Sequence, residues 1–151
     1  MSVNIAGAQK IGHLSADQIV LQMPAYKSAS SQLETLAKQL ETQLKTEEDR
    51  IREKVAKAEQ NASNLTPAEI AKIEGELQTD QQSLYANQGK YKQQLLAKEQ
   101  ELTAPIYEKI KSAIKSVAQE NGYSYVMETS MMLFSEDADD ITSLVKSKLG
   151  I

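Results

Sequence analysis

The apolar residues in the middle of the chain are arranged as mirror images about Asn64. On the two sides they are Tyr26, Leu33, Leu36, Leu44, Ile51, Val55 and Ala58, and then Ile70, Ile73, Leu77, Leu84, Tyr91, Leu95 and Leu102. Paired from the outside inward, their position numbers sum to 127 or 128 every time. Two antiparallel helices folded back near Asn64 would bring these pairs face to face, because both helices rise by about 1.5 Å per residue. The pattern therefore predicts a long helical hairpin.

The predicted seam of this hairpin is the row of apolar side chains at which the two helices meet. It consists of Leu33, Leu36, Leu44, Ile51, Val55, Ile73, Leu77, Leu84, Tyr91 and Leu95. Neither Gly nor Pro occurs between Pro24 and the turn expected at 61–65. After the turn, Thr66 and Glu69 match a capping box, in which each side chain satisfies a free backbone N–H group of the other. Pro67 suits the first helical position, where its missing N–H costs nothing.

The second helix is longer than the first and contains two glycines. Gly75 and Gly89 each cost about 1 kcal/mol relative to alanine, so they are either tolerated defects or positions at which the arm bends. Pro105 lies where the shorter helix runs out, and we expect a kink or a junction there. The helix is expected to run to about Glu120 and to stop at Gly122, which can adopt a left-handed cap.

Both ends of the chain have the composition of a small α/β body. Residues 10–14 are short and partly apolar, which indicates a strand. Ser15 and Gln18 form a further capping box, so a short helix is expected through about Gln22.

Near the carboxyl end, residues 123–127 and 131–134 have strand composition and are separated by three polar residues. Two such runs with a short connection indicate a β-hairpin. Residues 139–150 begin with acids, carry lysines near the end and finish on a glycine, which is typical of an amphipathic closing helix.

The predicted fold class is α+β and mostly α, with a long antiparallel helical hairpin on a small β body. Residues 9–24 and 104–151 are assigned to the body, and residues 25–103 to the hairpin arm, with its tip near 61–66. Residues 1–8 are expected to be disordered or a remnant of expression. Three short strands with little apolar content make a marginal body alone. We therefore expect several subunits to pool their strands in one shared body.

Composition excludes several classes of function. The chain has no cysteine, which excludes disulfides, thiolate metal sites and a cysteine nucleophile. The net charge of −4 argues against nucleic acid as a partner. No apolar run approaches the roughly 18 residues needed to cross a bilayer, so stable membrane insertion is not expected.

No catalytic, metal or cofactor site is expected, and the chain is not predicted to be an enzyme. His13 is the only histidine and has no cysteine or second histidine to join it, so a structural role is favoured over catalysis or metal binding. The acidic residues at 136–140 do not match a calcium loop. Ile141 would stand at the third ligand position, and the required glycine is missing.

Several segments resemble the Skp/OmpH family of periplasmic chaperones. They are residues 10–14, 23–26, the helical hairpin, 105–110, 117–126, 133–134 and the closing segment 140–142. The resemblance covers nearly the whole chain from Lys10 onward. Its most specific parts are the stretch from Pro105 to Val126 and the closing Asp-Ile-Thr.

The resemblance implies a homotrimer shaped like a jellyfish. Strands of all three subunits would build a small barrel-like body, and three helical hairpins would hang from it around a cavity. Members of the family hold unfolded outer-membrane proteins there without ATP, which implies a holdase chaperone of the periplasm. No cofactor is implied. The printed sequence contains no export signal, which we expect to have been removed.

This chain departs from the family in its charge. Well-known members are basic and carry positively charged arms, whereas this chain has a pI near 5.1. The acidic charge argues against electrostatic capture of clients or of lipopolysaccharide. No lipid-binding residues are carried over, and no client-binding residues are assigned, because one sequence does not reveal which helix face points inward.

Two matters stay open at the level of the residues. The hairpin could instead belong to a coiled-coil scaffold that binds one folded partner, and solution mass separates a trimeric chaperone from a monomer or a four-helix dimer. The candidates for the body core or the subunit interface are Ile11, Leu14, Val126, Met127, Leu133 and Phe134. Their apolar character is equally compatible with burial inside one subunit.

Overall fold

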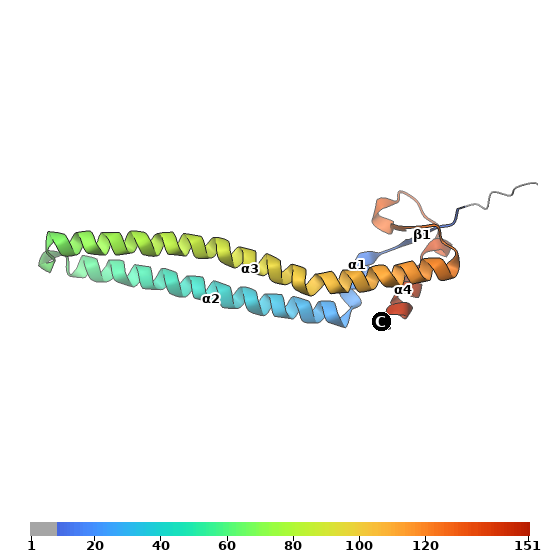
Figure 1. Ribbon diagram of the computed structural model, residues 1–151, viewed down its shortest axis with the longest axis horizontal. Helices are drawn as coiled ribbons and strands as arrows, with labels where there is room; N and C mark the ends of the chain where they lie inside the picture. Colours follow the sequence, from blue (N-terminus) through green and yellow to red (C-terminus); the bar gives the residue numbers. More distant parts are fainter. Residues whose placement is uncertain (1–8) are drawn as a thin grey trace, which may run out of the picture. The chain divides into compact units, whose positions relative to one another are not determined.

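A computed structural model describes residues 9–151; the segment 1–8, expected to be disordered or a remnant, lies outside the described residues. The helices and strands are β1 (Ile11–Leu14), α1 (Ala16–Gln22), α2 (Pro24–Gln60), α3 (Pro67–Asn121), β2 (Tyr125–Glu128) and α4 (Thr142–Leu149) (Figure 1). Short 3-10 turns are η1 (Ala62–Asn64), η2 (Thr129–Met131) and η3 (Asp137–Asp139). The mostly helical α+β class predicted from the sequence is confirmed.

The chain divides into two compact units, to which α2 and α3 both contribute. The hairpin unit is Ser31–Gln100, and the body unit consists of the described residues up to Ser30 together with Glu101–Ile151. No helix in the described part of the chain is long and apolar enough to cross a bilayer.

In the hairpin unit, α2 and α3 run side by side and are joined by the turn at the tip (Figure 1). Among the described residues of this unit, only Leu40 and Ile51 are buried, at 6% and 9% exposure. Ile51 belongs to the predicted seam and Leu40 does not; the other nine positions of the predicted seam are half-buried. Two helices cover each other's apolar stripe from one side only, so a seam of this kind keeps part of its apolar surface in contact with water.

The turn is closed by the predicted capping box. The backbone N–H of Thr66 donates to Oε2 of Glu69 at 2.8 Å, and the backbone N–H of Glu69 donates to Oγ1 of Thr66 at 3.3 Å. The hydrogen bond from the Thr66 backbone is the main reason that the pKa of Glu69 lies below its usual value. Pro67 stands at the first helical position, as expected.

The body unit has one hydrophobic core between α1, α4, the start of α2 and the last turns of α3. The buried residues of this core are Leu14, Ile19, Val20, Met23, Ala29, Ile106, Ile110, Ala113, Val117, Ile141 and Val145. Ser15 caps α1 as predicted, because its Oγ accepts from the backbone N–H of Gln18 at 3.4 Å. Gly122 and Gly150 adopt left-handed φ values of +72° and +75°, which end α3 and α4.

The two strands of the body unit pair in parallel, with Ile11 opposite Tyr125 and Leu14 opposite Glu128. Gly12 in β1 is required by the ring of Tyr123, because a Cβ at Gly12 would lie 2.9 Å from Cδ1 of Tyr123. The Nζ of Lys10 lies 4.0 Å from the centre of the same ring. A cation over the face of an aromatic ring is attracted to it electrostatically, so both Lys10 and the close approach of Gly12 tie Tyr123 to β1 and the residue before it.

The predicted β-hairpin of residues 123–127 and 131–134 is wrong. In the described residues, β2 has β1 as its partner, and residues 132–134 belong to no helix or strand. A 3-10 turn follows β2 directly, with the N–H of Met132 donating to the carbonyl of Thr129 at 3.1 Å. Met131, Leu133 and Phe134 are exposed and Met132 is half-buried, so within the described residues this apolar run forms surface and not a paired strand.

The closing helix begins later than predicted. Residues 137–139 form a 3-10 turn, and α4 starts at Thr142. Oδ1 of Asp140 accepts from the backbone N–H of Thr142 at 2.8 Å. Burial acts to raise the pKa of Asp140, but hydrogen bonds from Thr142 and nearby positive charge outweigh it and lower that pKa.

Candidate functional site

Two polar clusters cross the seam of the hairpin unit. In the first, Nζ of Lys54 lies 2.6 Å from Oδ2 of Asp80 and 3.3 Å from Oε2 of Glu76. A guanidinium nitrogen of Arg50 lies 3.2 Å from Oδ1 of Asp80. The hydrogen bond between Lys54 and Asp80 is the main cause that lowers the pKa of Asp80 and raises the pKa of Lys54. This cluster, the Asp80 cluster, links the two helices near the tip.

The second cluster lies further from the tip and is centred on Glu47. Its carboxylate oxygens accept from Nδ2 of Asn87 at 3.1 and 3.0 Å, and one also accepts from the hydroxyl of Tyr91 at 3.4 Å. Burial, followed by the charge of Glu47, raises the pKa of Tyr91. Tyr91, predicted to be an apolar seam residue, therefore also serves as a hydrogen-bond donor across the hairpin.

The sequence interpretation missed both clusters, although a signal was present. Lys54 and Asp80 have position numbers that sum to 134, and so do Glu47 and Asn87. The mirror relation that pairs the apolar residues also pairs polar residues at a small offset. Pairs of complementary polar residues whose position numbers add up to the same value were the signal that could have revealed these clusters.

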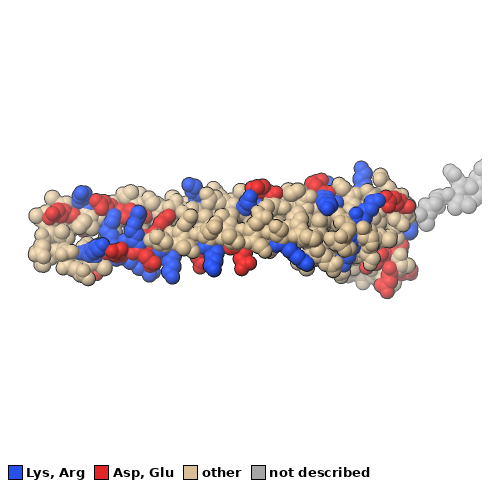
Figure 2. All heavy atoms as spheres, turned by 90° about the horizontal axis from the view of Figure 1, so that it is seen from below, with Lys and Arg blue, Asp and Glu red and all other residues tan. Residues whose placement is uncertain are grey.

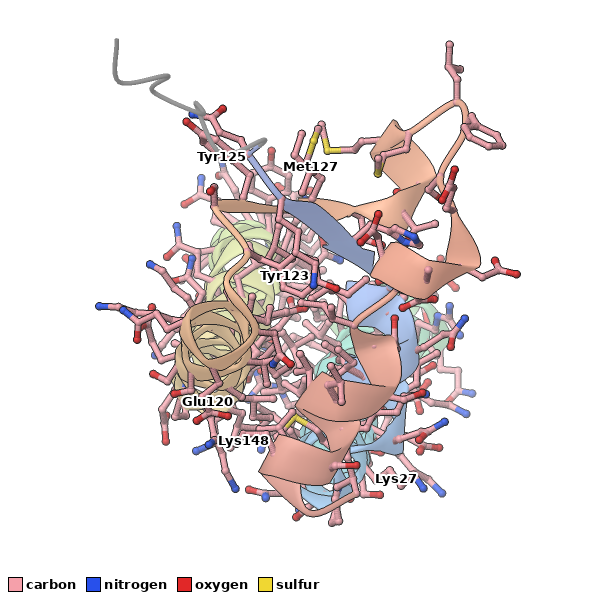
Figure 3. All side chains as sticks on the ribbon, turned by 90° about the vertical axis from the view of Figure 1, so that its right-hand side faces the viewer. Lys27, Glu120, Tyr123, Tyr125, Met127 and Lys148 are labelled. Carbon is pink, nitrogen blue, oxygen red and sulfur yellow. The ribbon has the colours of Figure 1, made fainter. Side chains whose placement is uncertain are left out.

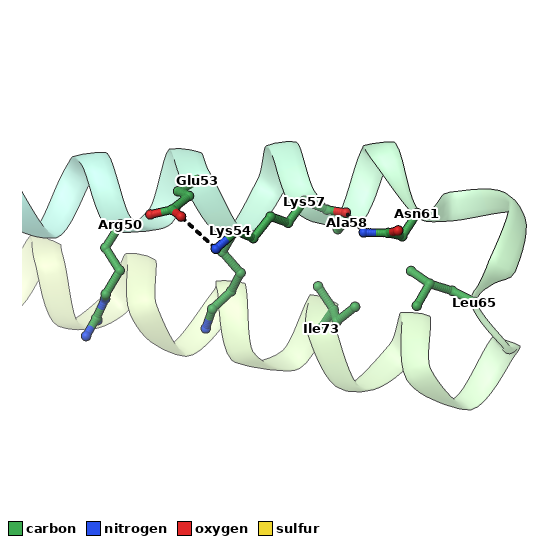
Figure 4. A pocket seen from close by; sticks show the side chains of 8 residues that line it. All are labelled: Arg50, Glu53, Lys54, Lys57, Ala58, Asn61, Leu65 and Ile73. Atoms are coloured by element: carbon green, nitrogen blue, oxygen red, sulfur yellow. Dashed lines mark hydrogen bonds and ion pairs between the residues drawn. The ribbon is translucent and has the colours of Figure 1, made fainter.

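Near the tip, the seam is hollowed on both of its sides. One hollow, of about 380 Å³, has a basic rim and is lined by Arg50, Glu53, Lys54, Lys57, Ala58, Asn61, Leu65 and Ile73 (Figure 4). The other hollow, of about 280 Å³, is lined by Val55, Ala58, Glu59, Ala62, Leu65, Ile70, Ile73, Glu74 and Leu77. We call them the basic hollow and the acidic-rimmed groove. Ala58, Leu65 and Ile73 line both, so these apolar side chains are reached from two directions.

The body unit carries an exposed apolar face on its small sheet. Tyr125 and Met127 lie on one side of the strands, and Tyr123 lies on the other side, toward α4 (Figure 3). Tyr125 is 57% exposed, Met127 41% and Ile11 43%. Met131, Leu133 and Phe134 follow with exposures of 76%, 109% and 79%. A small domain rarely leaves so many large apolar side chains uncovered in one region, and such patches mark interaction sites.

The six residues predicted for the core or the interface fall into two groups. Leu14 is buried in the core of the body unit, and Val126 is half-buried and packs against that core. In the described chain, Ile11, Met127, Leu133 and Phe134 are exposed, so they do not belong to the core of a single subunit. Tyr125 was missed, although the alternation of a strand places it on the same face as Met127.

His13 ties the segment after β2 to β1. It is 4% exposed, and its Nε2 donates to the carbonyl of Glu136 at 3.0 Å, while Nδ1 lies 2.9 Å from Oγ1 of Thr129. Both ring nitrogens are engaged, so the contacts of His13 are those of a structural residue. In the described residues, no group of three or more His, Cys, Asp or Glu side chains could hold a metal ion.

Charged residues of both signs are intermixed on the face shown in Figure 2. Lys57 pairs with Glu53 at 2.6 Å, and Arg52 pairs with Asp49 at 3.8 Å. This face therefore offers no extended patch of one sign that would attract a highly charged partner over a distance.

Comparisons with known proteins cover nearly the whole chain. The sequence model of the family described as Outer membrane protein (OmpH-like) matches residues 10–149. "Chaperone protein Skp" of Yersinia enterocolitica is 24% identical over 136 residues, which cover 90% of this chain and 83% of the relative. The protein of the same name from Photorhabdus laumondii is 26% identical over 144 residues, covering 95% and 87%. A crystal structure described as OmpH-like, from Caulobacter crescentus, has a TM-score of 0.82 at 17% identity, covers 93% of this chain and 83% of its own, and shows the same fold.

Proposed function

The chain belongs to the OmpH-like outer membrane protein family, and from that premise we propose that it is an ATP-independent holdase chaperone for unfolded outer-membrane proteins. The observation that carries the proposal is the family match over residues 10–149. The curated relatives that cover most of this chain are named chaperones, not enzymes. The place of action is the periplasm, where this family works.

The hairpin arm, residues 25–103, is the part proposed to contact clients. Its seam is only half-buried over most of its length, so apolar side chains remain available beside the paired helices. Burial of apolar surface contributes about 25 cal/mol per Å². Many small contacts of this kind can hold an unfolded chain away from other unfolded chains without one tight site, and aggregation of exposed apolar segments is what such holding prevents.

The body, residues 9–24 and 104–151, is proposed to hold three subunits together. A two-stranded sheet is marginal as an independent structure, and Ile11, Met127, Leu133 and Phe134 are exposed in the single chain. A homotrimer that pools these strands would cover the apolar face. Three hairpins would then surround a cavity in which a client is kept.

The charge of the arm favours apolar contacts over electrostatic capture. The basic residues Lys54 and Arg50 are paired with acids of the other helix, and the whole chain has a net charge of −4. We therefore propose no contact with lipopolysaccharide and no general attraction for acidic clients.

The proposal is tested by diluting a urea-unfolded β-barrel protein into buffer that contains the chain. At a threefold molar excess of the chain we expect light scattering from aggregates to be suppressed, and ATP should make no difference. No suppression at that excess would count heavily against a holdase. A tight complex with one folded protein, with no effect on unfolded ones, would indicate a scaffold instead.

A further inference from the structure

We propose that the acidic-rimmed groove near the tip of the hairpin takes an extended polypeptide segment in which an aliphatic or aromatic side chain is flanked by Lys or Arg. The inference deepens the proposed function and rests on it only for the source of the segment, an unfolded client. The occupant is argued from the apolar floor of the groove and from the charges at its rim.

The floor of the groove is apolar and open. Val55, Ala58, Leu65 and Ile73 are half-buried, and Ile70 is 39% exposed. Among the described residues, no side chain between positions 52 and 79 is buried, so this end of the seam has no closed core. The volume of about 280 Å³ lies just below the range of about 300–1,000 Å³ for small-molecule sites. The groove therefore suits one or two side chains of a peptide, not a folded surface.

The rim of the groove is acidic on both helices. Glu59 comes from α2 and Glu74 from α3, both are exposed, and neither forms an ion pair with a residue in the described part of the chain. The opposite side of the seam differs. There Lys54 is paired with Asp80. On the same side, Lys57 is paired with Glu53 (Figure 4). The positive charges of Lys54 and Lys57 in the basic hollow are thus neutralised by carboxylates of the same chain. The two carboxylates at the rim of the groove have no cation paired with them in the described residues.

The apolar floor and the acidic rim together determine which residues should flank the apolar side chain of the bound polypeptide segment. Two carboxylates on either side of an apolar floor favour an apolar side chain that enters between two cations, and like charge at the same positions is rejected. Lys and Arg can lay their apolar stems along the groove while their charged ends reach the rim. An extended chain rises about 3.3 Å per residue and turns successive side chains to opposite faces. Cations placed two positions before and after the apolar residue therefore lie on its side of the chain, about 7 Å away, and can reach the rim.

The test uses the full chain and three fluorescent peptides in an anisotropy titration at low ionic strength. One peptide has Ile and Phe flanked by Lys, the second has the same apolar residues flanked by Glu, and the third keeps Lys but replaces Ile and Phe by Ser. We expect only the first to bind. Equal binding of the Glu-flanked peptide, or of the Ser-containing peptide, overturns the proposal.

Charge variants locate the site. The E59Q/E74Q double variant removes the rim charges and should weaken binding of the first peptide by about two- to thirtyfold, the range for two exposed ion pairs. The matched control E34Q/E41Q removes two exposed carboxylates from α2 outside the groove and should leave the Kd unchanged. The E59K/E74K variant should shift the preference to the Glu-flanked peptide. An unchanged Kd in E59Q/E74Q, or an equal loss in the control, refutes the assignment.

A further measurement separates this inference from the proposed function. If aggregation of the unfolded β-barrel protein is suppressed but the Lys-flanked peptide does not bind, the groove assignment fails and the holdase stands. If the peptide binds but aggregation is not suppressed, the groove assignment stands and the holdase proposal fails. Concentration-dependent self-association that disappears in E59Q/E74Q would show that a second copy fills the groove, which also overturns the proposal.

Discussion

Replacing two glycines by alanine should stabilise the hairpin, and the structure sets the size of the effect. A Cβ added at Gly75 or Gly89 would have nothing within 4 Å. Each substitution therefore gains the difference in helix propensity without a steric cost, about 1 kcal/mol. The two sites are separated by 14 positions, or about 21 Å along a helix, so their effects should add. The G75A/G89A double variant should gain about 2 kcal/mol in total.

Thermal unfolding followed by circular dichroism at 222 nm measures this gain. For a chain of this size, each kcal/mol shifts the Tm by about 2–4 °C, so the double variant should unfold about 4–8 °C higher than the unsubstituted chain. Two other glycines provide matched controls with the opposite sign. G122A should destabilise because Gly122 has a φ of +72°, and G12A because its Cβ would meet the Tyr123 ring.

A lower Tm for G75A/G89A, or a higher Tm for G122A, would refute the reasoning. The same double variant tests whether bending of the arm matters. If the glycines let the hairpin adapt to its client, G75A/G89A should suppress aggregation of a large β-barrel protein less well than the unsubstituted chain, while a small one is held as before. Equal holding of both clients would show that the glycines are tolerated defects.

Three further perturbations have defined outcomes. The L133S/F134S variant should leave the secondary structure unchanged, because both side chains are exposed, but should lower the solution mass; an unchanged trimer mass would remove these residues from the interface. Asp140 has a folded pKa below its unfolded value of about 3.9, so it stabilises the fold above that value, and this contribution is lost as the pH falls through the folded pKa. The difference in urea midpoint between the unsubstituted chain and D140N should therefore be largest near neutral pH and shrink below about pH 4, and a difference that grows on acidification would contradict this. Thr66→Ala removes the cap of α3 and should cost about 0.5–2 kcal/mol, with faster amide exchange at the tip; exchange equal to that of the unsubstituted chain would refute the cap.

Features decided by local chemistry were predictable from the sequence. The constant sum of the apolar positions indicated the hairpin, the Thr66–Glu69 spacing indicated its turn, and Gly122 marked the end of α3. Each of these depends on helix geometry or on backbone groups a few residues apart. The cap and the helix end needed only neighbouring residues, and the hairpin needed only the regular rise of two helices within one chain.

Features decided by distant partners were missed. Residues 131–134 have strand composition, but β2 pairs with β1 from the other end of the chain, and Met131, Leu133 and Phe134 stay exposed. Apolar, strand-like composition indicates that a segment packs against something, but it does not identify the strand or subunit against which the segment packs. The Asp80 cluster was missed for a related reason, since charged residues were assumed to face water and the mirror relation was applied to apolar residues alone.

The central claim, that the chain holds an unfolded outer-membrane protein, is tested most directly by native mass spectrometry after such a protein has been diluted from urea into the chain. We expect a complex of three copies of the 16.7 kDa chain with one client, and amide exchange of the client should be as fast as in an unfolded chain. A precipitated client, with the chain observed only at the mass it has alone, would contradict the account.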